Sequence, residues 1–306
     1  MHAASPLPYV VFGVTGRTGA ATADALLRAG RKVRVVVRDV AHAIPWAARG
    51  AEIALADLTD LAAMTWALSQ AQGAYVINPQ QYGREDLFEL ADVIAGVTAR
   101  AAVAAQVPRL VALSSVGADR ASGTGWIGMN RAFEVQLATT SIPAVFLRAA
   151  YFMENWTPLV GHALRHGALP SFLSPPERPL AMVATRDVGS AAAALLQEEW
   201  TGTRALTLAG LRDYTPMEVA AIIAGTLGRP VDVKALPQAQ WPAALAEAGF
   251  SNAALVGFIE MTHALNSGHI DMRSDPAARV ERGTTPLEHV IAALARASYM
   301  VGPPVA

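Results

Sequence analysis

The chain has no cysteine among its 306 residues, which excludes disulfides, thiolate metal sites, iron–sulfur clusters and cysteine nucleophiles. It also lacks an excess of charge of one sign. The formal net charge is −1 and there is no basic stripe, so we expect no nucleic-acid partner. No unbroken apolar run reaches the ~18 residues of a membrane helix, and the first residues lack the pattern of a secretory signal. We therefore expect a cytoplasmic protein without a membrane partner.

The composition, with 53% hydrophobic and 16% charged residues, is typical of a folded protein with a large core. Short apolar runs alternate with segments of helical character. Such alternation predicts parallel strands joined by helical crossovers, and the continuous apolar strands favour a sheet covered on both faces. The expected fold class is therefore α/β, with a doubly wound parallel Rossmann sheet. We predict strands at 9–12, 32–37, 51–55, 74–77, 109–113 and 144–147, with helices at 17–30, 41–49, 61–70, 85–106 and 127–140.

The regular alternation of predicted strands and helices ends after Arg148. Residues 156–179 look irregular, and a further strand, helix and strand are predicted at 181–183, 185–198 and 205–208. Thr215, followed by Pro216 and Glu218, predicts the capped start of a helix. Beyond it the chain looks mostly helical, with a short strand at 231–233. We therefore predict a Rossmann domain (1–155, with 180–210 returning to it) and a smaller, mostly helical C-terminal domain (156–179 and 211–306) that forms a substrate cleft.

A glycine-rich loop lies directly between the first predicted strand and helix. Its spacing is GxxGxxG. Glycines there allow a tight turn and let a pyrophosphate approach the backbone N–H groups at a helix N-terminus. The sequence therefore predicts a nicotinamide dinucleotide site. Its expected residues are Gly13, Thr15, Gly16, Arg17, Thr18 and Gly19.

Further polar residues follow the predicted strands, at the sheet edge where such folds bind ligands. Arg38 follows the second strand, and a guanidinium there suits the 2′-phosphate of NADP. Asp39 beside it leaves NAD open, so we expect NADP(H), with NAD(H) as the alternative. Asp57 is a candidate partner of the adenine amino group. The other expected cofactor contacts after strand ends are Leu58, Asn78, Pro79 and Ser114.

The remaining groups of polar residues give weaker evidence for a metal site or a reaction. His162 and His166 have helical i, i+4 spacing but lack the intervening Glu of a zinc hydrolase and a third ligand, so we expect no metal. We select Tyr151, His162 and Tyr82 as candidates for proton delivery or substrate contact.

Several segments together resemble the NmrA-like group of atypical short-chain dehydrogenases/reductases, most of all its quinone- and triphenylmethane-dye-reducing members. They are GVTGRTGAATADALLRAGRKVRVVVRD, LVALSSVGA, VFLRAAYFMENW and RGTTPLEHVIAAL. The resemblance spans nearly the whole chain. It implies an NADP-type Rossmann domain in which the glycine loop, Arg38, Asp57 and Asn78 hold the cofactor. It also implies that Tyr151 to Asn155 lie near the nicotinamide.

One departure from the wider superfamily bears on the reaction. Its ordinary members use a Tyr-x-x-x-Lys pair to protonate an alkoxide. The only lysines here are Lys32 and Lys234, and neither lies four residues after a tyrosine. We therefore predict an NAD(P)H-dependent reductase for an electron-poor aromatic or quinoid small molecule: a quinone, an azo dye or a triphenylmethane dye. Glu134 matches a Glu of those relatives, but a solvated helix face is an equally good interpretation.

Two alternatives stay open at this point. The first is a non-catalytic NAD(P)-sensing regulator of the NmrA type, since a missing catalytic pair also suits a sensor. The second is an isomerase or epimerase that recycles a tightly held cofactor. Chains of this kind often pair, so a homodimer is the expected assembly.

Overall fold

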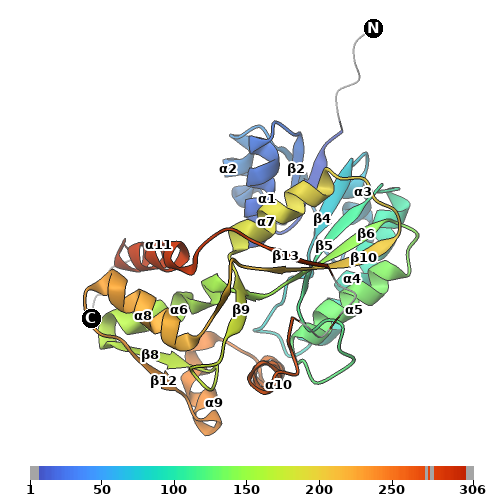
Figure 1. The fold of residues 1–306 in the computed structure, drawn as a ribbon. Helices are drawn as coiled ribbons and strands as arrows, with labels where there is room; N and C mark the ends of the chain where they lie inside the picture. The colour runs from blue at the N-terminus through green and yellow to red at the C-terminus, as the bar shows by residue number, and fades with distance from the viewer. Residues whose placement is uncertain (1–6, 273–274, 276–278, 301–306) are drawn as a thin grey trace.

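The computed structural model describes residues 7–272, 275 and 279–300. A large parallel sheet forms the centre of the molecule (Figure 1). Its strand order is β13-β10-β6-β5-β4-β1-β2-β3, and every neighbouring pair is parallel. The strands are β1 (Tyr9–Val11), β2 (Val33–Val37), β3 (Glu52–Leu55), β4 (Gly73–Val76), β5 (Leu110–Ser115), β6 (Ala144–Ala149), β10 (Thr203–Ala209) and β13 (Arg279–Arg282).

Helices cover both faces of this sheet because successive strand residues point to opposite sides. In the first strand Val11 packs into the core beneath α1 and α7, whereas Val10 packs into the core beneath α3, α4 and α5. The predicted doubly wound Rossmann sheet is confirmed. The helices are α1 (Arg17–Arg28) and α7 (Thr185–Leu196) on one face, α3 (Leu61–Leu68), α4 (Leu87–Ala104) and α5 (Ile127–Ala138) on the other, and a short 3-10 turn, η1 (Val40–His42), with α2 (Ile44–Ala47) after β2.

The direction of chain winding reverses between β1 and β4. From β1 the chain proceeds through β2 to β3, and from β4 it proceeds the other way through β5, β6 and β10. In open parallel sheets this reversal leaves a crevice at the carboxyl ends of the strands. The glycine loop follows β1, and Asn78 lies just beyond β4, so both flank this crevice.

The rest of the chain forms a smaller part beside the carboxyl edge of the sheet. It holds two small sheets, with strand orders β11-β9-β7 and β12-β8. Their strands are β7 (Tyr151–Phe152), β8 (Ala168–Ser171), β9 (Leu180–Val183), β11 (Asp213–Tyr214) and β12 (Asp232–Ala235). The helices are α6 (Thr157–His166), α8 (Pro216–Leu227), α9 (Trp241–Ala244), α10 (Asn252–Ser267) and α11 (Leu287–Met300), with short turns η2 (Met153–Trp156), η3 (Gln238–Gln240) and η4 (Ala246–Ala248).

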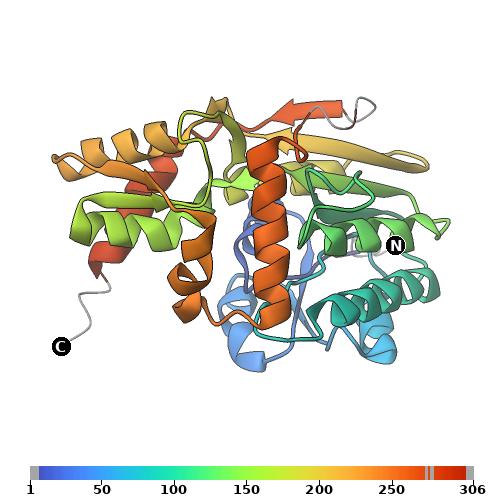
Figure 2. The ribbon, with the colours of Figure 1, turned by 90° about the horizontal axis from the view of Figure 1, so that it is seen from below.

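Helix α10 stands between the smaller part and the sheet (Figure 2). Trp126 at the start of α5 donates its indole N–H to the carbonyl oxygen of Ala254 in α10, at 2.8 Å. One turn further along α10, Phe258 makes an edge-on contact with Phe172 of the smaller part. This helix therefore joins the two parts. None of the helices in the described residues has the length and apolarity required to cross a bilayer.

The structure differs from the sequence prediction in three places. The segment 156–179, predicted to be irregular, contains α6 and β8. The strand predicted at 181–183 forms as β9, but it pairs with β7 and β11 instead of joining the large sheet. The C-terminal region contributes the edge strand β13 in addition to the expected strand β12. The division into two domains remains a prediction.

Candidate functional site

The glycine loop turns tightly between β1 and α1. Gly13 has a φ of +69°, which favours glycine, and its carbonyl oxygen accepts from the N–H of Gly16 at 2.9 Å. A Cβ on Gly19 would lie 2.3 Å from that same oxygen, so only glycine lets α1 approach β1 this closely. No side chain caps the N-terminus of α1. Its first N–H groups, together with the positive end of the helix dipole, are therefore suited to a phosphate.

The predicted loop residues divide by exposure. Thr15, Gly16 and Arg17 are exposed, whereas Thr18 and Gly19 are buried beneath them. Arg17 donates to the hydroxyl of Thr157 at 3.2 Å, so its guanidinium reaches from the loop to the start of α6. Thr15 and Arg17 thus face solvent beside the helix start, and Thr18 supports the loop from below.

Arg38 and Asp57 lie at the ends of two paired strands, β2 and β3. The Asp57 carboxylate accepts from the hydroxyl and the backbone N–H of Thr59, at 2.6 and 2.8 Å. These hydrogen bonds, and to a lesser extent the charge of Arg38, hold the pKa of Asp57 below its ordinary value. An ionised carboxylate and an exposed guanidinium therefore lie close together at this edge, with half-buried Leu58 next to them.

Asn78 and Pro79, after β4, line a large cleft. The Asn78 side chain donates to the carbonyl oxygen of Ala91 at 2.9 Å. Its own Oδ1 atom is buried and has no hydrogen-bond partner among the described residues. A buried acceptor without a partner is costly, so this atom is well suited to accept from a ligand hydroxyl or amide.

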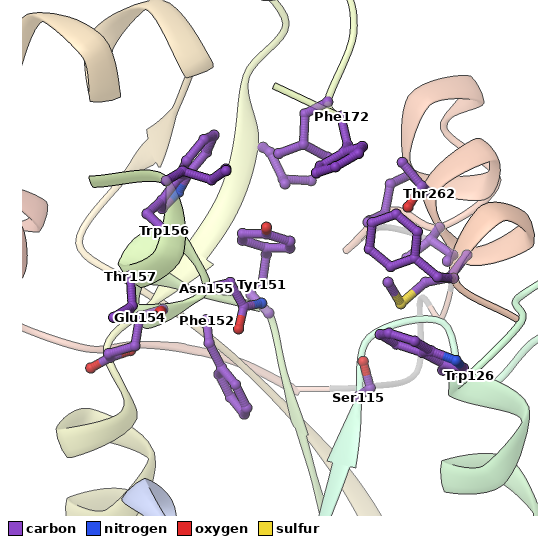
Figure 3. A pocket seen from close by; sticks show the side chains of 18 of the residues that line it. Ser115, Trp126, Tyr151, Phe152, Glu154, Asn155, Trp156, Thr157, Phe172 and Thr262 are labelled. Carbon is purple, nitrogen blue, oxygen red and sulfur yellow. Dashed lines mark hydrogen bonds between the residues drawn. The ribbon is translucent and has the colours of Figure 1, made fainter. Parts of the chain in front are cut away.

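Ser114, at the end of β5, is held by a buried ionic cluster. Its hydroxyl donates to Glu134 at 2.5 Å, and Glu134 accepts two further hydrogen bonds from Arg148, at 2.7 and 2.9 Å. Arg148 also pairs with Asp275 at 2.6 Å. Glu134 is only 6% exposed, so the interpretation of this residue as part of a solvated helix face was wrong. The neighbouring Ser115 has its hydroxyl at the cleft surface (Figure 3).

The cleft has a volume of about 1940 Å³ and is lined by both parts of the molecule. One side of it is a cluster of aromatic rings that we call the aromatic wall. The Tyr82 ring stacks on Trp126 with centroids 3.8 Å apart, and Phe250 and Phe258 meet Trp126 edge-on. Phe172 extends the wall from the smaller part. Such a wall can hold a flat, conjugated molecule by stacking.

The three predicted proton-transfer candidates all line the cleft but differ in what they can do. Tyr151 projects its hydroxyl into the open space (Figure 3), and burial raises its pKa to about 12. Tyr82 already donates its hydroxyl to Gln80. Burial, together with the charges of His166 and Arg165, lowers the pKa of His162. Among the three, Tyr151 is the protonated group at neutral pH with a hydroxyl facing the cavity.

The structure brings all fifteen predicted site residues to the cleft or to the edge of the sheet beside it. Those lining the cleft are Arg17, Asn78, Pro79, Ser114, Tyr82, Tyr151 and His162, and those at the sheet edge outside it are Gly13, Thr15, Gly16, Thr18, Gly19, Arg38, Asp57 and Leu58. Sequence reasoning missed Asn130, Arg165 and Lys234, which also line the cleft. Ser115, the last residue of β5, follows the strand predicted at 109–113, at the edge where ligands were expected. No group of three or more potential metal ligands occurs in the described part of the chain.

Comparison with known proteins identifies the family of this chain. The NmrA-like family matches residues 9–278. The chain belongs to the NmrA-like family. Quinone oxidoreductase 2 of Escherichia coli (strain K12) is 27% identical over 241 residues, which are 78% of this chain and 81% of the relative. The NAD(P)H azoreductase of Xenophilus azovorans is 26% identical over 226 residues, or 72% of this chain and 74% of the relative.

Solved structures show the same fold. The NADPH-dependent quinone oxidoreductase of Escherichia coli in complex with NADPH superposes with a TM-score of 0.79 at 24% identity, covering 94% of this chain and 99% of that one. The Citrobacter sp. triphenylmethane reductase in complex with NADP(H) gives a TM-score of 0.79 at 22% identity, with the same coverage. Both the predicted family and the predicted fold are confirmed.

Proposed function

We propose that this protein is an NAD(P)H-dependent reductase that transfers hydride to an electron-poor conjugated acceptor of the quinone, azo-dye or triphenylmethane-dye type. The proposal rests on one observation: the edge where the parallel strands end leads directly into the cleft. The glycine loop, the unpartnered Oδ1 of Asn78 and the aromatic wall follow one another along it. The relatives with this fold include a quinone oxidoreductase and an azoreductase.

The residues along this edge fit a nicotinamide dinucleotide of the NADP type. The N-terminus of α1, free of a side-chain cap, suits the pyrophosphate, and exposed Arg38 suits a 2′-phosphate. Asn78 offers its buried acceptor to the part of the cofactor nearest the cleft. Two solved structures of the same fold are complexes with NADPH and NADP(H).

The bound dinucleotide would supply the hydride, and the chain's own residues would position the acceptor and exclude water. The chain has no Tyr-x-x-x-Lys pair to protonate an alkoxide. Trp126 belongs to the aromatic wall, which fits an acceptor that is already electrophilic and needs mainly orientation. Hydride addition to a quinone or an azo group leaves an anion that takes up a proton, whereas a cationic triphenylmethane dye needs hydride alone. For the first two acceptors we assign delivery of the proton to Tyr151, whose hydroxyl faces the cavity while protonated.

The test is NADPH oxidation with a panel of a naphthoquinone, an azo dye and a triphenylmethane dye. We expect turnover with at least one acceptor. In Tyr151→Phe we expect kcat to fall by roughly tenfold to a hundredfold, at the lower end of general-acid effects because quinone products are also protonated by water. The loss should be smaller in Tyr82→Phe, since that hydroxyl is bound to Gln80.

The outcomes separate this proposal from a regulatory role. If NADPH binds but no acceptor accelerates its oxidation, the reductase assignment is wrong and the cofactor-sensing alternative takes its place. If Tyr82→Phe lowers kcat as much as Tyr151→Phe, the assignment of the proton donor is wrong while the reductase remains. A homodimer and a cytoplasmic location remain predictions, to be tested by light scattering and by cell fractionation.

A further inference from the structure

The side of the cleft formed by α6 and β12 is basic. Arg165 and Lys234 line it together with His162 and His166. The imidazole rings of the two histidines lie 4.5 Å apart on α6. Lys234 reaches the same cavity because β12 pairs with β8, which places it opposite Pro170 of the cleft lining. We call these four residues the basic side of the cleft.

Fixed positive charge remains on this side. Neither Arg165 nor Lys234 has an ion-pair partner among the described residues. The charge of Arg165 is one reason why the pKa of His162 is lowered, after burial and the charge of His166. The guanidinium of Arg165 and the ammonium of Lys234 therefore supply positive charge to this side.

None of the four acidic residues of the cleft lining forms an ion pair with Arg165 or Lys234 in the described part of the chain. Glu154 accepts from the backbone N–H and hydroxyl of Thr185 at the start of α7, at 3.0 and 2.7 Å. Asp213 lies 3.5 Å from Arg282. Glu247 lies on η4. The remaining acid, Asp271, follows α10.

The aromatic wall and the basic side line the same cleft, and Tyr151 lies between the wall and the start of α6. In the close-up Trp126 stands on one side of the Tyr151 ring, and Thr157, which begins α6, stands on the other (Figure 3). A molecule stacked on the wall therefore extends across Tyr151 toward α6. An acid group on such a molecule can approach the charges of Arg165 and Lys234, whose exposed side chains line the same cleft.

From this arrangement we propose that the acceptor is an aromatic compound with an anionic substituent, a sulfonate or a carboxylate, and that Arg165 and Lys234 determine this preference. The inference rests on the proposed reductase function and narrows its substrate class. The conjugated ring stacks on the aromatic wall beside Tyr151, and the acid group lies against the basic side.

The experiment compares 1,4-naphthoquinone-2-sulfonate with the neutral 2-methyl-1,4-naphthoquinone, NADPH being saturating. The readout is the ratio of the two kcat/KM values. Each acceptor's own electrophilicity cancels when the ratio in a variant is divided by the ratio in the wild type. We expect the ratio of sulfonate to neutral kcat/KM to fall roughly twofold to fivefold in Arg165→Ala or Lys234→Ala and about tenfold in the double variant. The fall should come mainly from a higher KM for the sulfonate.

A matched control removes a positive charge elsewhere. Arg100 is exposed near the end of α4 and does not line the cleft, so Arg100→Ala should leave the ratio unchanged. Raising the salt concentration should lower the wild-type ratio and flatten the difference between the wild type and the double variant, because exposed charges are screened. A ratio that stays the same in the double variant overturns the proposal.

Binding without turnover separates this inference from the proposed function. Naphthalene-2-sulfonate, which cannot be reduced by hydride, is titrated into wild type and double variant beside neutral 2-naphthol. Weaker binding of the sulfonate alone in the double variant supports the basic side as an anion site, even if no acceptor turns over. Equal effects on both ligands, or none, overturn it. Absence of turnover with sulfonate binding intact counts against the reductase function only.

Discussion

At the scale of single residues, Gly19 decides whether the glycine loop can form. A Cβ at this position would lie 2.3 Å from the carbonyl oxygen of Gly13 and 2.5 Å from that of Phe12. Both are backbone atoms and cannot rotate aside, so β1 and α1 must separate. The cost falls on the stability of the fold and on the loop that is proposed to bind phosphate.

We expect Gly19→Ala to lower the free energy of unfolding by about 1–3 kcal/mol, as overpacked sites do, and to weaken NADPH binding. The matched control is Gly96→Ala in the interior of α4, where an added Cβ meets nothing within 4 Å. That change should raise stability by roughly 0.4–1 kcal/mol. Urea denaturation and NADPH titration measure both variants. A Gly19→Ala protein as stable as the wild type would refute the close contact.

A second prediction at the scale of single residues concerns Glu134, which neutralises the buried guanidinium of Arg148. Arg148 donates two hydrogen bonds to it, and the side chain of each residue is about 10% exposed or less. Glu134→Ala leaves Arg148 with Asp275 as its acidic partner. Removing one member of a buried pair costs about 3–5 kcal/mol when the other charge is left without a partner, so with Asp275 still paired to Arg148 we expect a loss toward the lower end of that range. The exposed pair Arg204–Glu198 supplies the control, since Glu198→Ala should cost at most about 1 kcal/mol. Similar losses in urea denaturation would contradict this account.

At the scale of elements, the Rossmann half could be predicted because its signals are local. The strands β1, β2, β4, β5 and β6 are short apolar runs, and each has a helix or a turn signal beside it. The placement of Arg38, Asp57 and Asn78 then followed from a general property of parallel sheets, whose carboxyl ends meet at one edge.

The remaining elements depend on contacts between distant segments. Strand β13 reads Arg-Val-Glu-Arg and shows no strand pattern, since it forms by pairing with β10. Lys234 enters the site only because β12 pairs with β8. Helix α6 did carry signals, with Pro158 in its first turn and Gly167 in the left-handed conformation at its end, but Gly161 and the short length of the helix obscured them. Side-chain directions in such segments are set by tertiary packing.

Helix α8 shows a local signal that is both predicted and observed. The Thr215 hydroxyl accepts from the N–H of Glu218 at 3.1 Å, and the Glu218 carboxylate accepts from the N–H of Thr215 at 2.8 Å. Thr215→Ala should therefore lower the free energy of unfolding by about 0.5–2 kcal/mol. Thr226→Ala, an exposed change in the same helix, should alter it by less than about 0.5 kcal/mol. Equal effects in urea denaturation would show that the cap does not contribute.

At the scale of the whole molecule, cofactor binding and folding are coupled. The proposed dinucleotide site draws on β1, β2, β3 and β4, which are joined in one sheet, and Arg17 extends it to Thr157 in the smaller part. A ligand that binds only the folded chain stabilises every element that unfolds with this sheet. At a concentration one hundred times its Kd, NADPH should raise the free energy of unfolding by about 2.7 kcal/mol.

Arg38→Ala separates the contribution of the 2′-phosphate from the rest of this effect. Losing a hydrogen bond to a charged group costs about 1.5–3 kcal/mol, roughly a tenfold to hundredfold loss in affinity. At the same NADPH concentration the stabilisation should therefore fall from about 2.7 to between about 0.4 and 1.4 kcal/mol. NADH has no 2′-phosphate, so its stabilisation should be equal in both proteins, and Arg100→Ala should change neither. If Arg38→Ala weakens the effect of both cofactors alike, or of neither, Arg38 does not contact the 2′-phosphate and the preference for NADPH has another origin.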